Sequence, residues 1–380
     1  MTKINPPKIA LVTDWMTSFG GENKVLFALH TMFPEAPIFT TMYNPKELPM
    51  YKDAEIITSF LDRFPFTVFP KKKAQMFLPL MPLAFESFDF SDYDIVISSS
   101  HACSKGIITG VDTLHISYCH APMRYAWEGC HQYINENAPL KFLGGKAISY
   151  KIMHKMRMWD RLAADRVDAF ITNSHFIKRQ VKKFYQRDAQ VIYPPIETGN
   201  FHIDTHKEKY FLAGGRLIPN KKFELIVEAF NELGLPLKIF GKGPQLEFLA
   251  KKAKSNIEFL GFVDDKDVPK LFNKAQAFIV PQLEDFGIVT VESLASGTPV
   301  IGFGKGGTKE LVTNGVTGIL MEEQTVDNLI QKIKAFETMH FDSQKIRQSA
   351  MQYDIGTFKR NMTKFIDNAW QNHKESLLIN

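Results

Sequence analysis

Short apolar segments alternate with helix-length amphipathic segments along most of this 380-residue chain. Helices are predicted between the apolar segments, for example from Glu22 to Thr31 and from Ser174 to Tyr185, where Ser174 can act as the N-cap. This alternation is typical of parallel sheets that are covered by helices on both faces, so we predict an α/β fold. The strands predicted in the first half are Lys8–Thr13, Ile38–Met42, Ile56–Thr58, Asp94–Ser98, Leu114–Tyr118, Val167–Asn173 and Gln190–Tyr193.

The alternation is interrupted once, at Tyr193–Thr198, which contains two consecutive prolines. The polar segment that continues to Lys209 is predicted to be a hinge, and a second strand–helix series begins at Tyr210. A chain of 380 residues is long enough for two domains. We therefore predict one domain over residues 1–198 and a second over residues 199–357.

Composition narrows the class of protein. The balance of 46 basic and 41 acidic residues gives a net charge of +5, too mild to indicate a nucleic-acid partner. No apolar run approaches the roughly 20 residues needed to span a bilayer, and the polar Met1–Lys8 segment predicts no signal peptide. The cysteines Cys103, Cys119 and Cys130 lack the spacing of a metal site and suit a reducing compartment, so we expect a cytoplasmic protein.

Two glutamates flank a predicted turn from loop to helix in the second half. Glu284 precedes Gly287, and Glu292 lies in the predicted helix Ile288–Ser296. The first backbone N–H groups of a helix, here those of residues 287–289, attract a phosphate, whereas carboxylates accept hydrogen bonds from sugar hydroxyls. The pattern suits a nucleotide sugar, although an ordinary surface loop with a solvated glutamate would give the same pattern.

Basic and glycine-rich loops follow other predicted strands of this half. Arg216 and Lys221 lie between the predicted strand Tyr210–Ala213 and a predicted helix, where their charges can meet a diphosphate. Gly241 and Gly243 lie in the turn Phe240–Pro244, and another turn is Gly304–Thr308. Each alone is also explained by surface charge or a tight turn. Together they favour a ligand site, because ligands bind at the carboxyl edge of parallel sheets.

The order of these motifs resembles the retaining glycosyltransferases of family 4, which have the GT-B fold. The resemblance rests on the two glutamates at their EX7E spacing and on five further segments. These are GGRLIPNK from Gly214, Phe240–Pro244, FLGFV at Phe259–Val263, GTPVI from Gly297, and NGVTG at Asn314–Gly318. In the first half, the Gly20–Gly21 loop resembles the glycine-rich first loop of the family. Tyr118–Trp127 and Trp159–Ser174 resemble the WbaZ-like bacterial mannosyltransferases.

The resemblance implies an architecture. Two Rossmann-like, doubly wound domains would face each other across a cleft, with the acceptor bound by the first and the nucleotide sugar by the second. The last helix, Phe358–His373, would cross back, so that residues 358–380 join the first domain.

The resemblance also assigns roles to residues. Arg216, Lys221 and the amides of Gly287, Ile288 and Val289 would bind the diphosphate, and Glu292 and Glu284 would bind ribose and donor-sugar hydroxyls. His120, for which a buried structural role is favoured on position alone, would face the transferred sugar. Asp14 and Arg124 are assigned to the acceptor, although Asp14 could equally cap a helix. The remaining donor-binding predictions are Gly20, Gly21, Gly241, Gly243, Phe262 and Phe286.

The activity implied is retaining transfer of a hexose, favouring mannose from GDP-mannose, to a lipid-linked or lipopolysaccharide (O-antigen) glycan. Alternatives are the same transfer from a UDP-sugar, a GT-B epimerase or phosphorylase, and a non-catalytic nucleotide-sugar-binding protein. No cofactor or metal is expected. The Asp92–Asp94 and Asp265–Asp267 pairs have the D-x-D spacing of metal-dependent transferases, but they are predicted at a strand entrance and a helix start.

Two segments of the first domain, residues 64–83 and 146–161, mix cations with large apolar residues. Interfacial membrane segments have this composition, so we expect peripheral association with the cytoplasmic face of the inner membrane. The alternative is that one apolar stripe packs in the core while the basic stripe is solvated.

Overall fold

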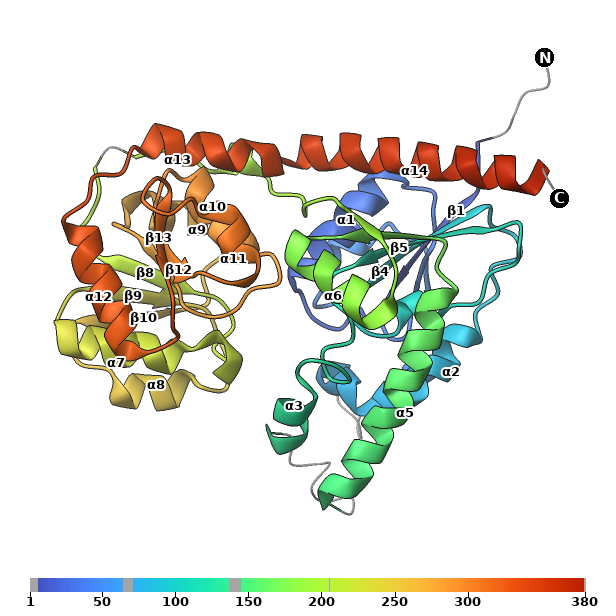
Figure 1. The fold of residues 1–380 in the computed structure, drawn as a ribbon, viewed down its shortest axis with the longest axis horizontal. Helices are drawn as coiled ribbons and strands as arrows, with labels where there is room; N and C mark the ends of the chain where they lie inside the picture. The colour runs from blue at the N-terminus through green and yellow to red at the C-terminus, as the bar shows by residue number, and fades with distance from the viewer. Residues whose placement is uncertain (1–5, 64–70, 137–144, 205, 379–380) are drawn as a thin grey trace. The chain divides into compact units, whose positions relative to one another are not determined.

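The computed structural model describes residues 6–63, 71–136, 145–204 and 206–378 (Figure 1). The chain divides into two compact units. Unit 1 comprises Met1–Tyr193 and Phe358–Asn380, and unit 2 comprises Pro194–Thr357. Each unit is a parallel sheet with helices packed around it, so the predicted α/β class with two Rossmann-like domains is confirmed.

The sheet of unit 1 has the strand order β3-β2-β1-β4-β5-β6-β7. Its strands are β1 (Ile9–Thr13), β2 (Ile38–Thr40), β3 (Ile56–Thr58), β4 (Ile95–Ser100), β5 (Leu114–Cys119), β6 (Ala169–Thr172) and β7 (Ala189–Val191). Its helices are α1 (Gly21–Met32), α2 (Met81–Glu86), α3 (Cys130–Glu136), α5 (Gly145–Asp165), α6 (His175–Tyr185) and most of α14 (Ile355–Leu378), with short 3-10 helices η3 (Lys71–Leu80) and η4 (Ser104–Gly106). The order reverses between β1 and β4, and such a reversal is where doubly wound sheets bind ligands.

The sheet of unit 2 has the order β10-β9-β8-β11-β12-β13 and reverses between β8 and β11. Its strands are β8 (Phe211–Gly214), β9 (Leu237–Phe240), β10 (Ile257–Gly261), β11 (Phe278–Val280), β12 (Val300–Phe303) and β13 (Gly318–Met321). Its helices are α7 (Phe223–Leu233), α8 (Leu246–Lys252), α9 (Val268–Lys274), α10 (Ile288–Ala295), α11 (Gly306–Leu311), α12 (Val326–Glu337) and α13 (Ser343–Ala350). The strands are mostly apolar and buried, as expected when helices cover both faces of a parallel sheet.

The last helix, α14, packs on unit 1. Its residues Phe358, Met362 and Ile366 are buried in one apolar cluster with residues of β1, β4 and β5. The predicted return of the C-terminal helix to the first domain is therefore confirmed.

The units divide after Tyr193, a few residues before the boundary predicted at Thr198. Ile196 forms a parallel bridge with Asp354, and its N–H donates to the Tyr353 carbonyl at 3.1 Å. These contacts hold the proline-containing segment to unit 2. Among the described residues, no helix is both long and apolar enough to cross a membrane.

Candidate functional site

The strand-end loops of unit 2 that carry the predicted donor residues are neighbours. Strands β8 and β11 are adjacent where the order reverses. Arg216 and Lys221 follow β8, and Glu284 and Gly287 follow β11, so the sheet brings the two loops together. Arg216 is exposed, and Lys221 ends the short 3-10 helix η6 (Pro219–Lys221).

The two loops are joined by an ion pair. Lys221 Nζ lies 2.7 Å from Glu284 Oε1, and Gln282 Nε2 donates to the same oxygen at 2.7 Å. The side chains of Lys221 and Glu284 are 24% and 18% exposed, so both reach the surface only in part. The pair holds one cation and one carboxylate in a fixed position at the carboxyl edge of the sheet, where a charged, hydroxylated ligand would meet both.

Helix α10 begins directly after this pair. Its N-cap, Gly287, has φ of +104°, a conformation that favours glycine. The N–H groups of Ile288 and Val289 in the first turn have no acceptor within the helix. Such free N–H groups at the start of a helix attract anions, so the anion-binding role predicted for them is compatible with the structure.

Thr290, in the first turn of α10, is a further candidate that was not predicted from the sequence. Its side chain is 1% exposed, and among the described residues its hydroxyl has no hydrogen-bond partner. The hydroxyl Oγ1 lies 3.1 Å from the position that a Cβ atom on Gly287 would occupy. Buried hydroxyls normally have partners, so a ligand oxygen near Gly287 is a candidate. A threonine in the first turn after a left-handed glycine was the available signal.

Two glycines of α11 support the same loop. A Cβ on Gly306 would lie 2.4 Å from the Glu284 carbonyl oxygen, and one on Gly307 would lie 2.2 Å from that of Phe286. The Gly307 N–H donates to the Glu284 carbonyl at 2.8 Å. Only glycine allows this approach, so the turn after β12 fixes the backbone around the anion site.

Gly241 and Gly243 have a supporting role as well. A Cβ on Gly241 would lie 1.8 Å from the Gly215 carbonyl oxygen, and one on Gly243 would lie 2.3 Å from that of Leu217. The Leu217 N–H donates to the Lys242 carbonyl at 2.9 Å. These glycines pack against the backbone on either side of Arg216 and so help to hold that loop, and their predicted contact with the donor stays a prediction.

The aromatic predictions differ in outcome. The Phe286 ring is buried and packs edge-on against Tyr353 at 5.7 Å between centroids, so any contact with a donor would come from its backbone, and its predicted role stays a prediction. Phe262 is 62% exposed, with Lys242 Nζ 4.9 Å from its ring centroid, and can stack on a base.

Glu292, the second glutamate of the predicted pair, lies on α10 and is buried.

In unit 1, His120 directly follows β5. Its Nε2 lies 2.8 Å from Ser99 Oγ, and its carbonyl accepts from Asn173 Nδ2 at 2.9 Å. Burial, with a smaller contribution from His101, lowers the pKa of His120 to about 3. The imidazole is therefore neutral at physiological pH. With Nε2 held by Ser99, Nδ1 is the ring atom that remains for a ligand, which suits a hydrogen bond to a sugar hydroxyl.

Asp14 has contacts of a structural kind, which favour the capping alternative over the predicted acceptor contact. The carboxylate is fully buried and accepts from the backbone N–H groups of His101, Ala102, Cys103 and Ser104 at 2.6–3.0 Å. His101 Nδ1 lies 3.1 Å from it. These groups use the lone pairs that an acceptor hydroxyl would need, so Asp14 fixes the turn between β4 and η4.

The remaining predicted residues of unit 1 lie at strand ends too. Gly20 is the N-cap of α1 in an extended conformation, and a Cβ there would meet only the flexible Glu22 side chain, at 2.4 Å. Gly21, the first residue of α1, and Arg124, in the turn after His120, are exposed. Their predicted roles stay predictions.

One aspartate of each D-x-D pair has a partner within the protein. Asp94 accepts from the Lys8 N–H at 2.7 Å, and Asp267 pairs with Lys270 at 2.8 Å. Within the described ranges, no group of three or more His, Cys, Asp or Glu side chains is placed to hold a metal ion.

The second unit matches a known family. Residues 200–353 match the family described as "Glycosyl transferases group 1". Unit 2 is a group 1 glycosyltransferase domain. The match covers nearly all of unit 2, including the residues of that unit that are predicted to bind the donor.

Curated relatives that match half to two thirds of this chain include further glycosyltransferases. An uncharacterized glycosyltransferase of Methanocaldococcus jannaschii is 27% identical over 62% of this chain and 68% of its own length. The O-antigen chain mannosyltransferase RfbU of Salmonella typhimurium is 24% identical over 53% of this chain and 60% of its own length. A GDP-mannose-dependent phosphatidylinositol monomannoside mannosyltransferase of Mycobacterium tuberculosis is 25% identical, over 50% and 57%. The last two matches span less than two thirds of the relative's length.

Solved structures show the fold. Anabaena HepE in complex with UDP superposes with a TM-score of 0.70 at 16% identity, covering 95% of this chain and all of HepE. Sucrose-phosphate synthase of Thermosynechococcus elongatus gives 0.72 at 17% identity, covering 96% and 100%. Both match across the two units, so the GT-B fold is confirmed.

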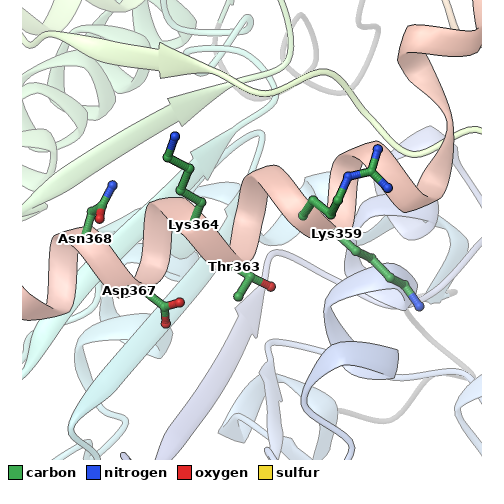
Figure 2. Close-up of a pocket in the computed structure, with 6 residues that line it drawn as sticks. Lys359, Thr363, Lys364, Asp367 and Asn368 are labelled. Carbon is green, nitrogen blue, oxygen red and sulfur yellow. The ribbon is translucent and has the colours of Figure 1, made fainter.

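A shallow pocket outside the group 1 domain lies along α14. Figure 2 shows Lys359 and Lys364 extending from opposite sides of the helix, and the lining residues are Lys359, Arg360, Thr363, Lys364, Asp367 and Asn368. All six come from one helix, and none is a predicted site residue. We assign this pocket no role in the site.

Acid should destabilise the protein through its buried histidines. His115 is fully buried with Nε2 2.9 Å from Ser98 Oγ, and burial lowers its pKa to about 3, as for His120. The unfolded chain binds these protons near pH 6.5, so stability is full above that pH and falls between pH 6.5 and 3. Each histidine should contribute a slope of up to about 1.4 kcal/mol per pH unit.

Urea unfolding of the protein at pH 7, 6 and 5 measures this slope. His115→Gln should reduce the slope of the unfolding free energy against pH by about the contribution of one histidine. His131→Gln, which removes an exposed histidine, is the matched control. A profile that His115→Gln leaves as steep as before would contradict the prediction.

Proposed function

We propose that this chain is a retaining glycosyltransferase that moves a hexose from a nucleotide sugar to a lipid-linked or lipopolysaccharide glycan. The observation that carries the proposal is the Lys221–Glu284 pair beside the amino end of α10, within a group 1 glycosyltransferase domain. Cations and free N–H groups there match a diphosphate, and the carboxylate matches sugar hydroxyls. A site for a neutral metabolite would not need this charge.

Each residue has one task in the proposed reaction. Arg216, Lys221 and the first N–H groups of α10 hold the diphosphate and stabilise it as it leaves. Thr290 adds a hydroxyl to that group, Glu284 binds the donor sugar, and Glu292 binds the ribose. We propose that these fixed positive groups neutralise the leaving group without a metal ion.

The stereochemical course follows from which carboxylates are available. Glu284 is held by Lys221 and Gln282, and Asp14 is buried under four backbone N–H groups, so neither is presented as a nucleophile. We favour attack by the acceptor hydroxyl on the face that the diphosphate leaves. The C1–O bond to the diphosphate breaks, the acceptor oxygen bonds C1, and its proton passes to a diphosphate oxygen. A neutral His120 would hydrogen-bond the transferred sugar, with Ser99 holding its ring and Asn173 holding its backbone carbonyl.

For the donor we propose GDP-mannose. Two relatives at 24–25% identity, the O-antigen mannosyltransferase and the GDP-mannose-dependent mycobacterial enzyme, support it. The structures of HepE were obtained with UDP, which favours a UDP-sugar as the second candidate.

Thermal shift with a panel of nucleotide sugars tests donor and metal together. At about a hundred times the dissociation constant, the true donor should raise the melting temperature by roughly 5 to 10 °C, by mass action on the folded state. A shift with GDP-mannose and GDP that EDTA leaves unchanged supports the proposal. A shift with UDP compounds alone would replace the donor, loss of the shift in EDTA would reject the metal-free site, and no shift at all would favour a non-catalytic protein.

A further inference from the structure

Helix α5 carries a mixed apolar and basic stripe on its solvent side. Ile148, Lys151, Lys155, Met158 and Leu162 are spaced by three and four residues, so they share one face of the helix. Ile148, Met158 and Leu162 are 44%, 55% and 62% exposed, and both lysines are exposed. Three large aliphatic side chains in a row on a solvent-facing helix need an explanation.

Packing in the core of unit 1 does not explain these exposed aliphatic side chains. The opposite side of α5 is already buried, and Met153 and Met156 lie in one apolar cluster with Phe77, Met81 and Phe85 of η3 and α2. The sequence allowed either a core stripe or a membrane-facing stripe. The structure shows that α5 has a stripe for the core and a second one that faces outward.

Further exposed apolar side chains belong to the same part of unit 1. Met76, Leu80 and Leu83, from η3 and α2, are 47%, 43% and 60% exposed. Glu86 at the end of α2 accepts from Trp159 Nε1 of α5 at 2.7 Å and pairs with Arg166, the residue directly after α5, at 2.9 Å. Figure 1 shows α2 beside α5. Residues 64–70 of the predicted segment 64–83 lie outside the described residues.

The first fifteen residues of α5 carry positive charge only. Residues 145–159 include Lys146, Lys151, Lys155 and Arg157 but no aspartate or glutamate. The next acidic residue, Asp160, is fully buried, and Asp165 pairs with Arg161. Aliphatic side chains interleaved with lysines complement an anionic lipid surface, where methylenes enter the acyl boundary and ammonium groups meet phosphates.

We propose that the outer face of α5 rests on an anionic lipid bilayer. Ile148, Met158 and Leu162 would enter the interface, and Lys151 and Lys155 would contact the headgroups. The proposal rests on this surface alone and does not require the proposed transferase activity, although a lipid-linked acceptor would lie in the same membrane.

Flotation of the full-length protein with vesicles tests the proposal, without nucleotide. Binding should occur with vesicles of phosphatidylcholine and phosphatidylglycerol, and should weaken in high salt and with phosphatidylcholine alone. Each lysine near the surface is worth about one kcal/mol, so Lys151→Gln with Lys155→Gln should lower the partition coefficient by about 30-fold. Met158→Gln with Leu162→Gln should lower it by a factor of ten or more, because buried methylenes are lost.

Matched controls remove the same groups elsewhere. Lys334→Gln with Lys345→Gln neutralises two exposed lysines of unit 2, and Ile108→Gln with Val111→Gln replaces two exposed aliphatic residues of unit 1. Both should bind vesicles like the unaltered protein. Absence of vesicle binding, or binding that the α5 variants leave unchanged, would overturn the proposal. So would a dimer, seen by sedimentation, that Met158→Gln with Leu162→Gln dissociates.

Discussion

Replacing Arg216 and Lys221 together with alanine should lower sugar transfer by a factor of about a thousand or more. Removing one electrostatic group from a preorganised site commonly costs about a hundredfold to a thousandfold in turnover, and both cations are assigned to the leaving diphosphate. The fold should remain, because Arg216 is exposed and the Lys221–Glu284 pair is partly exposed. Pairs of this kind contribute about 0–1 kcal/mol to stability.

The measurement is transfer of labelled sugar from GDP-mannose, and from a UDP-sugar, into a bacterial membrane lipid extract. The melting temperature of each variant is recorded alongside. Lys334→Ala with Lys345→Ala removes the same charge from exposed positions of unit 2 and should transfer at the normal rate. Unchanged transfer by the Arg216→Ala, Lys221→Ala variant would refute the assignment of the diphosphate site. If that variant melts early, Lys221→Met, which keeps the aliphatic stem, separates folding from charge.

The loops proposed to bind the donor can be picked out in the sequence because their chemistry is local. Arg216, Lys221 and Glu284 each follow an apolar strand, and the ends of parallel strands share one edge of the sheet. What the sequence did not contain was the strand order. The reversal between β8 and β11 makes those two loops neighbours and allows Lys221 to reach Glu284.

Several candidate site residues have contacts within the protein itself that the sequence does not reveal. Asp14 and its partners at 101–104 are 87 to 90 residues apart in the chain, so no local pattern reveals that the carboxylate is occupied. The same holds for Gly241, whose neighbour is the Gly215 carbonyl, and for Phe286, whose ring packs on Tyr353. Local patterns show that a residue is special, and only tertiary contacts show whether a ligand or the backbone requires it.

A buried polar network also joins residues that are far apart in the sequence, so no local pattern predicts it. Lys105 and Asp160 form an ion pair, and their side chains are 1% and 0% exposed. Asp160 also accepts from Trp127 Nε1 and Tyr185 OH, each at 2.7 Å, and Lys105 Nζ donates to the Ala102 carbonyl at 2.9 Å. The network ties α5 and α6 to the turns after β4 and β5, and so holds the segment that contains His120.

Asp160→Asn should therefore destabilise the protein by about 3–5 kcal/mol, because it leaves the Lys105 ammonium buried without a counter-charge. Urea unfolding measures the loss, and the melting temperature should fall by roughly 10 °C. Asp165→Asn breaks the exposed Arg161–Asp165 pair on the same helix and should cost less than about 1 kcal/mol.

The double variant Lys105→Met, Asp160→Asn separates charge from packing. If the unpaired ammonium is the cause, removing it should restore much of the stability, because the asparagine oxygen can still accept from Trp127 and Tyr185. The double variant should then be more stable than Asp160→Asn alone. Losses that simply add would show that Lys105 stabilises unit 1 through its contacts with Tyr185 and Ala102, and that the ion pair itself contributes little. The comparison decides whether the segment that contains His120 is stabilised mainly by the Lys105–Asp160 ion pair or by packing contacts.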